Sequence, residues 1–328
     1  MRIYPGLFSA AGKLGGGAVA LGNFDGVHLG HRALFADAAR HGGTCAALTF
    51  EPHPVQILAP RLAPPLIASP RRKRELMAGA GVQALVIQRF DRDFARTEPA
   101  RFVQMLVDLA VGEVVVGYDY TYGRDRAGNV AGLRVALEER GVRLHVVPPV
   151  TAEGLVVSST KVRELSLEGR MEAVARLLGR PLDLDGTVVR GAGRGKKLGW
   201  PTANLQLEAG QLLPAIGVYA VRARLVEGGS TPDDGDFLPP NLSPPLPAAA
   251  NLGLNPTFRD TGVLVAGQKP PLLLEVHLID FAGDLYGKTL RAEFVEKLRD
   301  ERRFPNVQSL KEQIARDVEQ ARRVLAGP

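Results

Sequence analysis

The chain has 328 residues, enough for roughly two domains of ~100–200 residues each. Its hydrophobic content of 45% and charged content of 23% are typical of a globular protein and exclude general disorder. No apolar run reaches the ~18 residues of a membrane-spanning helix, the N-terminal residues lack a secretory layout, and a single cysteine, Cys45, excludes an internal disulfide. We therefore expect a cytoplasmic protein that does not bind membranes.

The formal net charge is +6, and all of it lies in the first 180 residues, which carry 23 Lys+Arg against 17 Asp+Glu. A positive field of this kind suits either nucleic acid or small anionic substrates. Aromatic residues make up only 6% of the chain. The single dense basic run, residues 71–74, is interpreted as a solvated helix face. We expect small anions rather than nucleic acid as partners.

The first half of the chain alternates short apolar runs with amphipathic segments. The expected strands are residues 18–21, 44–50, 84–87, 114–116 and 144–147. The expected helices are residues 29–40, 71–78, 99–109 and 133–140. Continuously apolar strands separated by helices predict a doubly wound parallel sheet with helices on both faces. Such sheets bind ligands at the carboxyl ends of their strands.

From Leu182 onward, the strand-like runs follow one another without intervening helices. They are residues 186–189, 218–226, 272–279 and 289–294, and this order predicts an antiparallel barrel or sandwich. We expect the two domains to span residues 1–182 and 183–328. Residues 228–247 are rich in Pro, Gly and Asp, so we predict a solvated surface excursion there.

One amphipathic helix is expected at the end of the chain. Its apolar residues recur at near four-residue spacing between Leu310 and Leu325. Ser309 and Glu312 have the spacing of a capping box, which places the start of this helix near Ser309.

The sequence GNFDGVHLGH, residues 22–31, follows an apolar strand and opens a helix. Glycines let backbone N–H groups approach an anion, and the helix start adds partial positive charge. His28 and His31 share one helix face, where two imidazoles suit the phosphates of a nucleotide. A simple strand-ending turn and a metal-binding histidine pair are the alternatives. The combination of strand, glycines and histidines favours phosphate binding.

A second polar segment, VSSTKVR at residues 157–163, supports a phosphate site. It places Ser159 and Thr160 at a predicted helix start and Arg163 one turn further on. Alone, the hydroxyls would be read as N-caps. Beside the histidine turn they could hold the outer phosphates, with Arg163 offering a bidentate guanidinium.

These motifs resemble the adenylyltransferase superfamily with its HxGH signature. TFEPHP at residues 49–54 and GYDYTYGRDRAGN at residues 117–129 narrow the resemblance to the FAD synthetase module of bacterial bifunctional riboflavin kinase/FAD synthetases. The resemblance implies transfer of AMP from ATP to the phosphate of FMN, giving FAD and pyrophosphate, with Mg²⁺ bridging phosphates.

The same resemblance assigns site residues. It implies that the ATP site consists of Gly22, Asn23, Phe24, Asp25, His28, His31, Asp119, Ser159, Thr160 and Arg163. His28 and His31 would stabilise the α-phosphate and the departing pyrophosphate, and Ser159, Thr160 and Arg163 would hold the β/γ end. His53, inside the TFEPHP motif, is a candidate for the FMN side.

A second constellation begins with the basic, glycine-rich run GAGRGKKLG at residues 191–199, which precedes WPTAN. A loop of this kind can fold over polyphosphate, although the P-loop order is absent. Thr202 and Asn204 alternate with Ala203, so their side chains point the same way in extended chain. Their oxygens suit Mg²⁺. An ordinary turn after Pro201 is the alternative.

Glu275 interrupts the apolar run LLLEVHLI at residues 272–279. A period of two places Glu275 and His277 on one face and the leucine and valine side chains on the other. A carboxylate in such a strand is costly unless it is paired, solvated or employed, and an exposed sheet face remains an alternative explanation. As a general base, Glu275 could take the proton of a hydroxyl that attacks the γ-phosphate of ATP.

GTVVRGAGRGKKLGWPTANL at residues 186–205, NLGLNPTF at 251–258 and LEVHLIDFAGDLYG at 274–287 resemble the riboflavin kinase module of the same bifunctional family. The resemblance implies a Greek-key-like barrel with a C-terminal helix, and conversion of riboflavin and ATP to FMN and ADP. It assigns Thr202 and Asn204 to Mg–ATP and Glu275 as catalytic base. It further implies phosphate contacts from Gly193, Arg194 and Lys197, and a flavin- or phosphate-side contact from Arg291.

Two other functions remain possible at this point. One is a different HxGH nucleotidyltransferase that carries an unrelated barrel. The other is a nucleic-acid-binding module that uses its basic first half, in which case Glu275 and the Thr-x-Asn pair would have no purpose.

Overall fold

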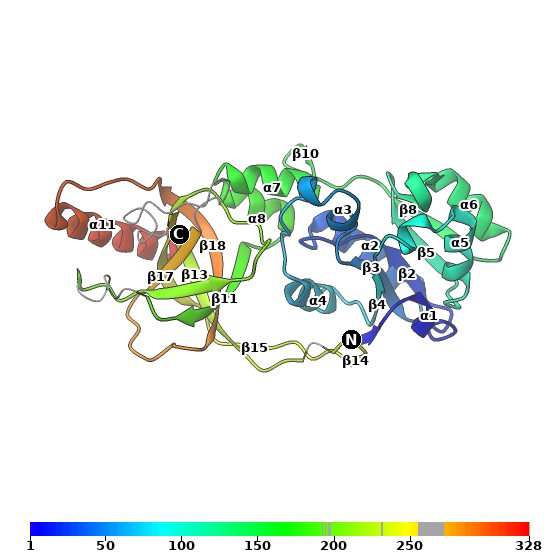
Figure 1. The fold of residues 1–328 in the computed structure, drawn as a ribbon, viewed down its shortest axis with the longest axis horizontal. Helices are drawn as coiled ribbons and strands as arrows, with labels where there is room; N and C mark the ends of the chain where they lie inside the picture. The colour runs from blue at the N-terminus through cyan, green and yellow to red at the C-terminus, as the bar shows by residue number, and fades with distance from the viewer. Residues whose placement is uncertain (192, 194, 196–197, 231, 255–271, 328) are drawn as a thin grey trace. The chain divides into compact units, whose positions relative to one another are not determined.

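The computed structural model describes residues 1–191, 193, 195, 198–230, 232–254 and 272–327 (Figure 1). Its internal contacts form two compact units. The first contains Met1–Ser159 and Gly229–Pro240, and the second contains Thr160–Gly228 and Asn241–Pro328. The contacts therefore group α8 (Met171–Leu178) and most of α7 (Ser159–Leu167) with the second unit.

The first unit is built on a parallel sheet. From one edge to the other its parallel strands are β1 (Arg2–Tyr4), β4 (Ala84–Arg89), β3 (Cys45–Glu51), β2 (Ala18–Leu21), β5 (Glu113–Gly117) and β8 (Arg143–Val147). The central strands are apolar at consecutive positions because both of their faces are covered. All five strands expected in this half are present, and β1 is an addition.

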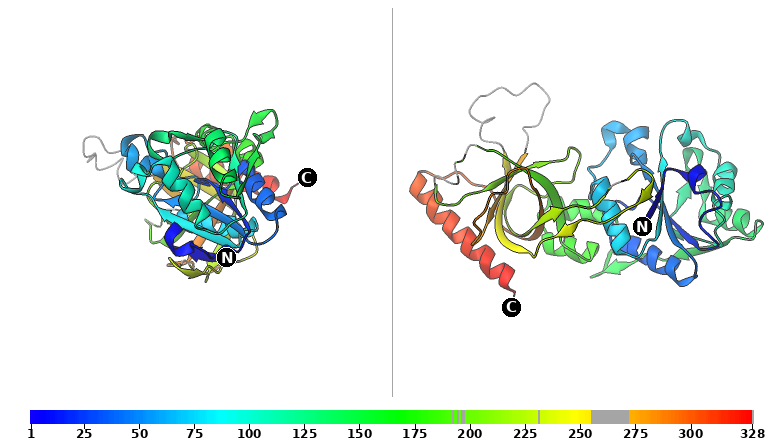
Figure 2. Two further views of the ribbon diagram at one scale, coloured as in Figure 1. Left: turned by 90° about the vertical axis from the view of Figure 1, so that its right-hand side faces the viewer. Right: turned by 90° about the horizontal axis from the view of Figure 1, so that it is seen from below.

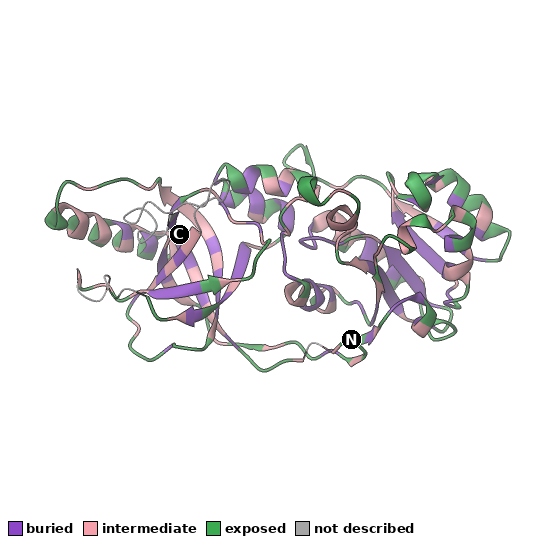
Figure 3. Cartoon of the chain, in the orientation of Figure 1, coloured by how far each residue is buried: buried purple, intermediate pink, exposed green. Residues whose placement is uncertain are grey.

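Helices cover both faces of this sheet. α1 (Leu7–Ala10), α5 (Pro99–Val107) and α6 (Val130–Glu138) bury their apolar sides on one face. α2 (Leu29–Arg40) and α4 (Pro70–Gly79) cover the other. In Figure 3 the strands are largely buried, whereas the outer sides of α5 and α6 are exposed. The prediction of a doubly wound parallel sheet is confirmed.

Short elements complete the first unit around the carboxyl ends of the strands. They are α3 (Pro54–Leu58), the pairs β6 (Thr121–Tyr122) with β7 (Gly128–Asn129) and β9 (Thr151–Ala152) with β10 (Leu155–Val156), and the single turns η1 (Pro60–Leu62), η2 (Phe94–Arg96) and η3 (Arg124–Arg126). Residues of α3, η2, β6 and η3 line a cavity described below.

The sheet of the first unit receives one strand from far along the chain. β14 (Gly235–Asp236) pairs antiparallel with β1, and the Phe237 N–H donates to the Met1 carbonyl at 2.8 Å. The Phe237 side chain is 1% exposed and packs into the same core as Ile3 and Phe35. The predicted solvated excursion is therefore wrong at Phe237, whereas Asp236 of the paired strand is exposed. Burial of one aromatic side chain and pairing with the open edge of the sheet order this part of the segment, despite its Pro- and Gly-rich composition.

The second unit is a closed antiparallel barrel. Its strands are β13 (Gly217–Glu227), β16 (Leu246–Leu254), β17 (Leu272–Leu278), β12 (Ala203–Leu207), β11 (Leu182–Val189) and β18 (Thr289–Arg299), and β18 pairs back onto β13 (Figure 2). The short β15 (Asn241–Leu242) adds to β13. The structure thus decides between the two predicted arrangements in favour of the barrel.

The C-terminal helix α11 (Val307–Ala326) packs on the barrel through Val318, Ala321, Val324 and Leu325. Its N-cap is Asn306, whose side-chain oxygen accepts from the Ser309 N–H at 2.8 Å. The capping box predicted at Ser309 is therefore wrong, and the helix begins earlier. Asn caps a helix as well as Ser does, so the S-x-x-E spacing at residues 309–312 does not by itself locate the start of the helix.

Candidate active sites

The histidine turn connects the buried strand β2 to α2. His28 is the N-cap of α2, and its Nδ1 accepts from the His31 N–H at 3.2 Å. The two imidazole rings stack with their centroids 3.5 Å apart. A Cβ at Gly30 would lie 3.1 Å from the His28 ring, so a glycine lets the ring lie against the first turn. The turn therefore presents both imidazoles together at the carboxyl end of β2.

His31 is held in its neutral form. Burial is the main cause that lowers its pKa well below 6.5, and the nearby His28 and Lys73 add to the effect. Its Nδ1 is buried and finds no hydrogen-bond partner among the described residues. A neutral imidazole beside a positive group can accept or donate a hydrogen bond without adding charge to the site.

Other residues of the turn serve to hold it. The Asp25 carboxylate is buried and accepts from the backbone N–H groups of Ile67 at 2.9 Å and Ala68 at 3.3 Å. Phe24 is fully buried and packs against His31 and Phe35. Both were predicted within the ATP site. The structure gives them contacts that fix the loop on which the histidines sit.

The basic run on α4 is not a solvated face. Lys73 and Arg74 are buried, and both contact Glu51 at the end of β3, at 3.2 and 3.0 Å. Lys73 also donates to the Thr49 hydroxyl at 3.3 Å. The prediction is therefore wrong for these two residues, because their partners lie more than twenty positions upstream. The TFEPHP motif thus contributes a buried ion-pair cluster beside the histidine turn.

Three predicted segments, at residues 22–31, 117–129 and 157–163, meet around one cavity of about 220 Å³. Its lining includes Gly22, His28, His31, Asp119 and Ser158. The Ser159 hydroxyl donates to the Asp25 carbonyl at 3.0 Å, so the start of α7 lies against the histidine turn. Thr160 and Arg163 follow on α7 within the second unit. We call this cavity the histidine cavity.

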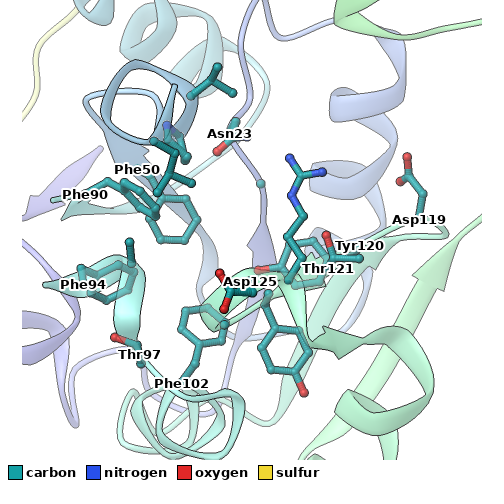
Figure 4. A pocket seen from close by; sticks show the side chains of 18 residues that line it. Asn23, Phe50, Phe90, Phe94, Thr97, Phe102, Asp119, Tyr120, Thr121 and Asp125 are labelled. Carbon is teal, nitrogen blue, oxygen red and sulfur yellow. The ribbon is translucent and has the colours of Figure 1, made fainter. Parts of the chain in front are cut away.

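A larger cavity of about 470 Å³ lies beside it and is lined by aromatic rings (Figure 4). The rings are those of Phe50, Phe90, Phe94, Phe102, Tyr120 and Tyr122. Gly22, Asp119 and Tyr120 line both cavities, and Asn23 lines only the larger one. Burial raises the pKa of Tyr120, which keeps its hydroxyl protonated. We call it the aromatic cavity.

None of these six aromatic residues was proposed as a site residue from the sequence. The available signal was the spacing of three phenylalanines within residues 90–102 and the tyrosines of GYDYTYG. His53, the predicted flavin-side residue, is the N-cap of α3, where its Nδ1 accepts from the Val55 N–H at 3.3 Å. Pro54, Val55 and Leu58 line the aromatic cavity, so the motif contributes α3 as a wall.

In the barrel, neighbouring strands align three polar residues. Asn204 on β12 and Asn251 on β16 are each paired in register with Glu275 on β17. Leu274, Val276 and Leu278 are buried, whereas Glu275 and His277 are partly exposed, which confirms the predicted alternation. Three oxygen-bearing side chains therefore form a row across adjacent strands on one face.

The glycine-rich loop passes close to this row. A Cβ at Gly191 would lie 2.2 Å from the Asn204 amide nitrogen, and one at Gly195 would lie 3.0 Å from the Thr202 hydroxyl. Glycine is needed at both positions for the backbone to come this near. Gly193 is exposed with a φ of +65°. Arg194 and Lys197 lie outside the described residues.

Arg291 lies inside the barrel wall. It is fully buried and binds the Asp185 carboxylate through Nε at 2.6 Å and Nη2 at 2.7 Å, across the β11–β18 pairing. A bidentate pair of this kind fixes both side chains. The predicted flavin- or phosphate-side contact thus falls on a residue whose guanidinium is engaged within the protein.

Comparison with known proteins agrees with this division of the chain. A family model described as FAD synthetase matches residues 12–161, and one described as riboflavin kinase matches residues 178–325. The second match excludes the alternative of an unrelated barrel. No described helix is long and apolar enough to cross a membrane.

Individual relatives cover nearly the whole chain. A bifunctional riboflavin kinase/FMN adenylyltransferase from Pseudomonas fluorescens is 35% identical over 100% of this chain and 99% of its own length. The Escherichia coli K12 protein of the same description is 36% identical over 92% of this chain and 90% of its own. A solved Streptococcus pneumoniae structure described as a macrolide-efflux protein superposes with a TM-score of 0.82 at 28% identity, covering 98% of this chain and 99% of that one. The chain belongs to the bifunctional riboflavin kinase/FMN adenylyltransferase family and is an enzyme with both activities.

Proposed function

We propose that FAD is formed where the histidine cavity and the aromatic cavity share their walls. The aromatic rings suit the flat isoalloxazine ring of FMN, and the histidine turn suits the phosphates of ATP. Because Gly22, Asp119 and Tyr120 line both cavities, a flavin phosphate and a nucleotide α-phosphate can meet there. This shared wall is the observation that carries the proposal.

The chemistry at this site requires no protein nucleophile. An oxygen of the FMN phosphate attacks the α-phosphorus of ATP, and the bond to pyrophosphate breaks. His28 and His31 face the leaving pyrophosphate, where they stabilise the developing charge. Ser159, Thr160 and Arg163 hold the outer phosphates, and the buried Lys73 keeps the surroundings positive.

We further propose that FMN is formed at the Glu275 row of the barrel. Glu275 accepts the proton of the riboflavin primary hydroxyl as that oxygen attacks the γ-phosphorus of ATP and ADP leaves. The glycine-rich loop, with Gly193, Arg194 and Lys197, covers the phosphates. The register that aligns Asn204, Asn251 and Glu275 supports this assignment.

Magnesium suits both reactions, because each uses ATP. Thr202 and Asn204 offer the hard oxygen donors that Mg²⁺ prefers. When bound, Mg²⁺ would neutralise phosphate charge during transfer. We also propose a boundary between the catalytic domains near residues 182–183, a cytoplasmic location, and no nucleic-acid or membrane partner. The riboflavin kinase match begins at residue 178, close to this boundary, which supports it.

Single substitutions that each remove one of the two activities test the assignment of two separate sites. Glu275→Gln should reduce FMN formation by at least about 100-fold, the range for loss of a general base, and leave the conversion of FMN to FAD unchanged. His28→Ala should do the reverse. Products from riboflavin, ATP and Mg²⁺ are separated by chromatography, with FMN supplied directly in a second set of reactions.

Glu227→Gln, at an exposed end of β13, is the matched control for loss of a carboxylate in the barrel. It should leave both activities unchanged. If one site variant removes both activities in a chain that is still folded, the assignment of two separate sites is wrong.

A further inference from the structure

A second group of histidines lies at the far end of α2 from the catalytic pair. Asp37 and His41 occupy the last turn and C-cap of α2, and His145 lies on the edge strand β8. His41 is ten residues beyond His31, which corresponds to about 15 Å along a helix axis. The group is therefore at the amino ends of the strands, away from both cavities.

The donor atoms of this group are close together. His41 Nε2 lies 3.2 Å from Asp37 Oδ2, and the rings of His41 and His145 stack with centroids 3.8 Å apart. One donor atom from each of Asp37, His41 and His145 lies within 4.8 Å of the other two. Among the described residues, no other group of three such donors is this compact.

A neighbouring carboxylate orients the third ligand. Glu113 is buried at the start of β5 and contacts His145 Nε2 at 2.6 Å through Oε2. Residues that hold a metal-bound histidine by its other nitrogen fix the ring and its tautomer. Glu113 is itself held by Arg143 on β8. The contact with Glu113 on the neighbouring strand β5 therefore fixes the orientation of the His145 ring.

We propose that Asp37, His41 and His145 form a binding site for a divalent transition ion such as Zn²⁺. Two imidazoles and one carboxylate match the ligand set and the three-ligand number of open zinc sites. Donors around a tetrahedral ion lie about 3.3 Å apart, so side-chain rotations close the group around the metal. Imidazole nitrogen disfavours Mg²⁺, which keeps this site distinct from the Mg–ATP sites.

The charges around the group permit a cation. Arg40 Nη1 lies 4.0 Å from Asp37, but the Arg40 side chain is 77% exposed and free to turn into solvent. The side chains of Asp37, His41 and His145 are 20–31% exposed, so an ion can enter directly from water. A bound ion would tie the end of α2 to β8 and stabilise the helix that carries His28 and His31.

The test uses the full-length chain, treated with chelator and titrated with Co²⁺ in the absence of ATP. A tetrahedral Co²⁺ site gives intense visible absorption, and Zn²⁺ should abolish it by displacement. His145→Ala should abolish the band. Asp37→Asn, a milder change, should weaken Co²⁺ binding by at least ten-fold. Glu113→Gln should weaken it by about 10–100-fold, as found for residues that orient a ligand.

Two further variants locate the ion. His277→Ala removes a histidine on the barrel, and His28→Ala removes one of the catalytic pair. Both should keep the band and its affinity. The proposal is overturned if the wild-type chain gives no saturable band, if His145→Ala and Asp37→Asn keep it while circular dichroism shows them folded, or if His28→Ala abolishes it. The last outcome would assign the ion to the catalytic histidines.

Discussion

Individual side chains at the histidine turn divide into those that hold the site and those that face the ligand. The sequence motif marks all of residues 22–31 alike. The structure separates Asp25, which binds the backbone of Ile67 and Ala68, from His28 and His31, which line a cavity. No local pattern could reveal this division, because the partner amides lie more than forty residues away.

The neutral state of His31 predicts that ATP binding takes up protons. In the free protein burial keeps its pKa well below 6.5. A triphosphate brings negative charge to the ring, and a nearby opposite charge raises the pKa of a histidine. Proton uptake should therefore be greatest at pH values between the pKa of the free ring and the higher pKa of the ATP-bound ring, and it should fade as the pH rises above the latter. Calorimetric titration in two buffers of different ionisation enthalpy measures it.

His31→Gln should remove most of this uptake. His41→Gln, on the same helix but outside both cavities, should leave it unchanged when both proteins have first been freed of transition metal with chelator. Uptake in His31→Gln equal to that of the wild-type chain would show that another group accepts the protons and that His31 does not face the phosphates.

At the scale of elements, local patterns locate strands and helices but not their distant partners. The expected ranges 18–21 and 29–40 coincide with β2 and α2, because an apolar run and an amphipathic repeat are properties of the segment itself. The aromatic cavity, by contrast, takes residues from β3, η2, α5 and the β6 hairpin. It exists only once the sheet has brought these elements together.

The aromatic cavity predicts a defect specific to FMN. Phe90 contacts Phe50 and Phe94 at ring distances of 5.8 and 5.9 Å and is only half-buried. Phe90→Ala should raise the KM for FMN about ten-fold, the equivalent of one aromatic contact. The KM for ATP in FAD synthesis and the riboflavin kinase rate should not change. Steady-state kinetics with each substrate varied in turn measure these effects.

Phe8→Ala is the matched control, because Phe8 belongs to the same unit and is 97% exposed. It should behave as the wild-type chain. If Phe90→Ala raises the KM for ATP instead, the aromatic cavity binds ATP and not FMN.

At the scale of the molecule, the chain crosses between its units more than once. Residues 229–240 belong to the first unit, whereas the residues on either side of them belong to the second. Docking of this segment covers the β1 edge, which would otherwise expose unpaired backbone groups. The segment also binds the chain terminus, since Phe237 donates to the Met1 carbonyl. Part of the stability of the first unit therefore comes from a loop of the barrel.

This dependence predicts that Phe237→Ala weakens the first unit and not the barrel that carries it. Loss of a buried Phe in a closed core costs about 3–5 kcal/mol. The loss here is bounded by the docking free energy of the segment, because the segment can detach. FAD synthesis should therefore be lost at lower urea concentration while riboflavin kinase activity keeps its wild-type resistance. The Phe237 amide should also lose its protection from hydrogen exchange.

Leu238→Ala, in the same segment but with a side chain that is 62% exposed, should change neither activity. An equal loss of urea resistance in both activities, or an effect of Leu238→Ala as large as that of Phe237→Ala, would show that β14 does not stabilise the sheet through Phe237.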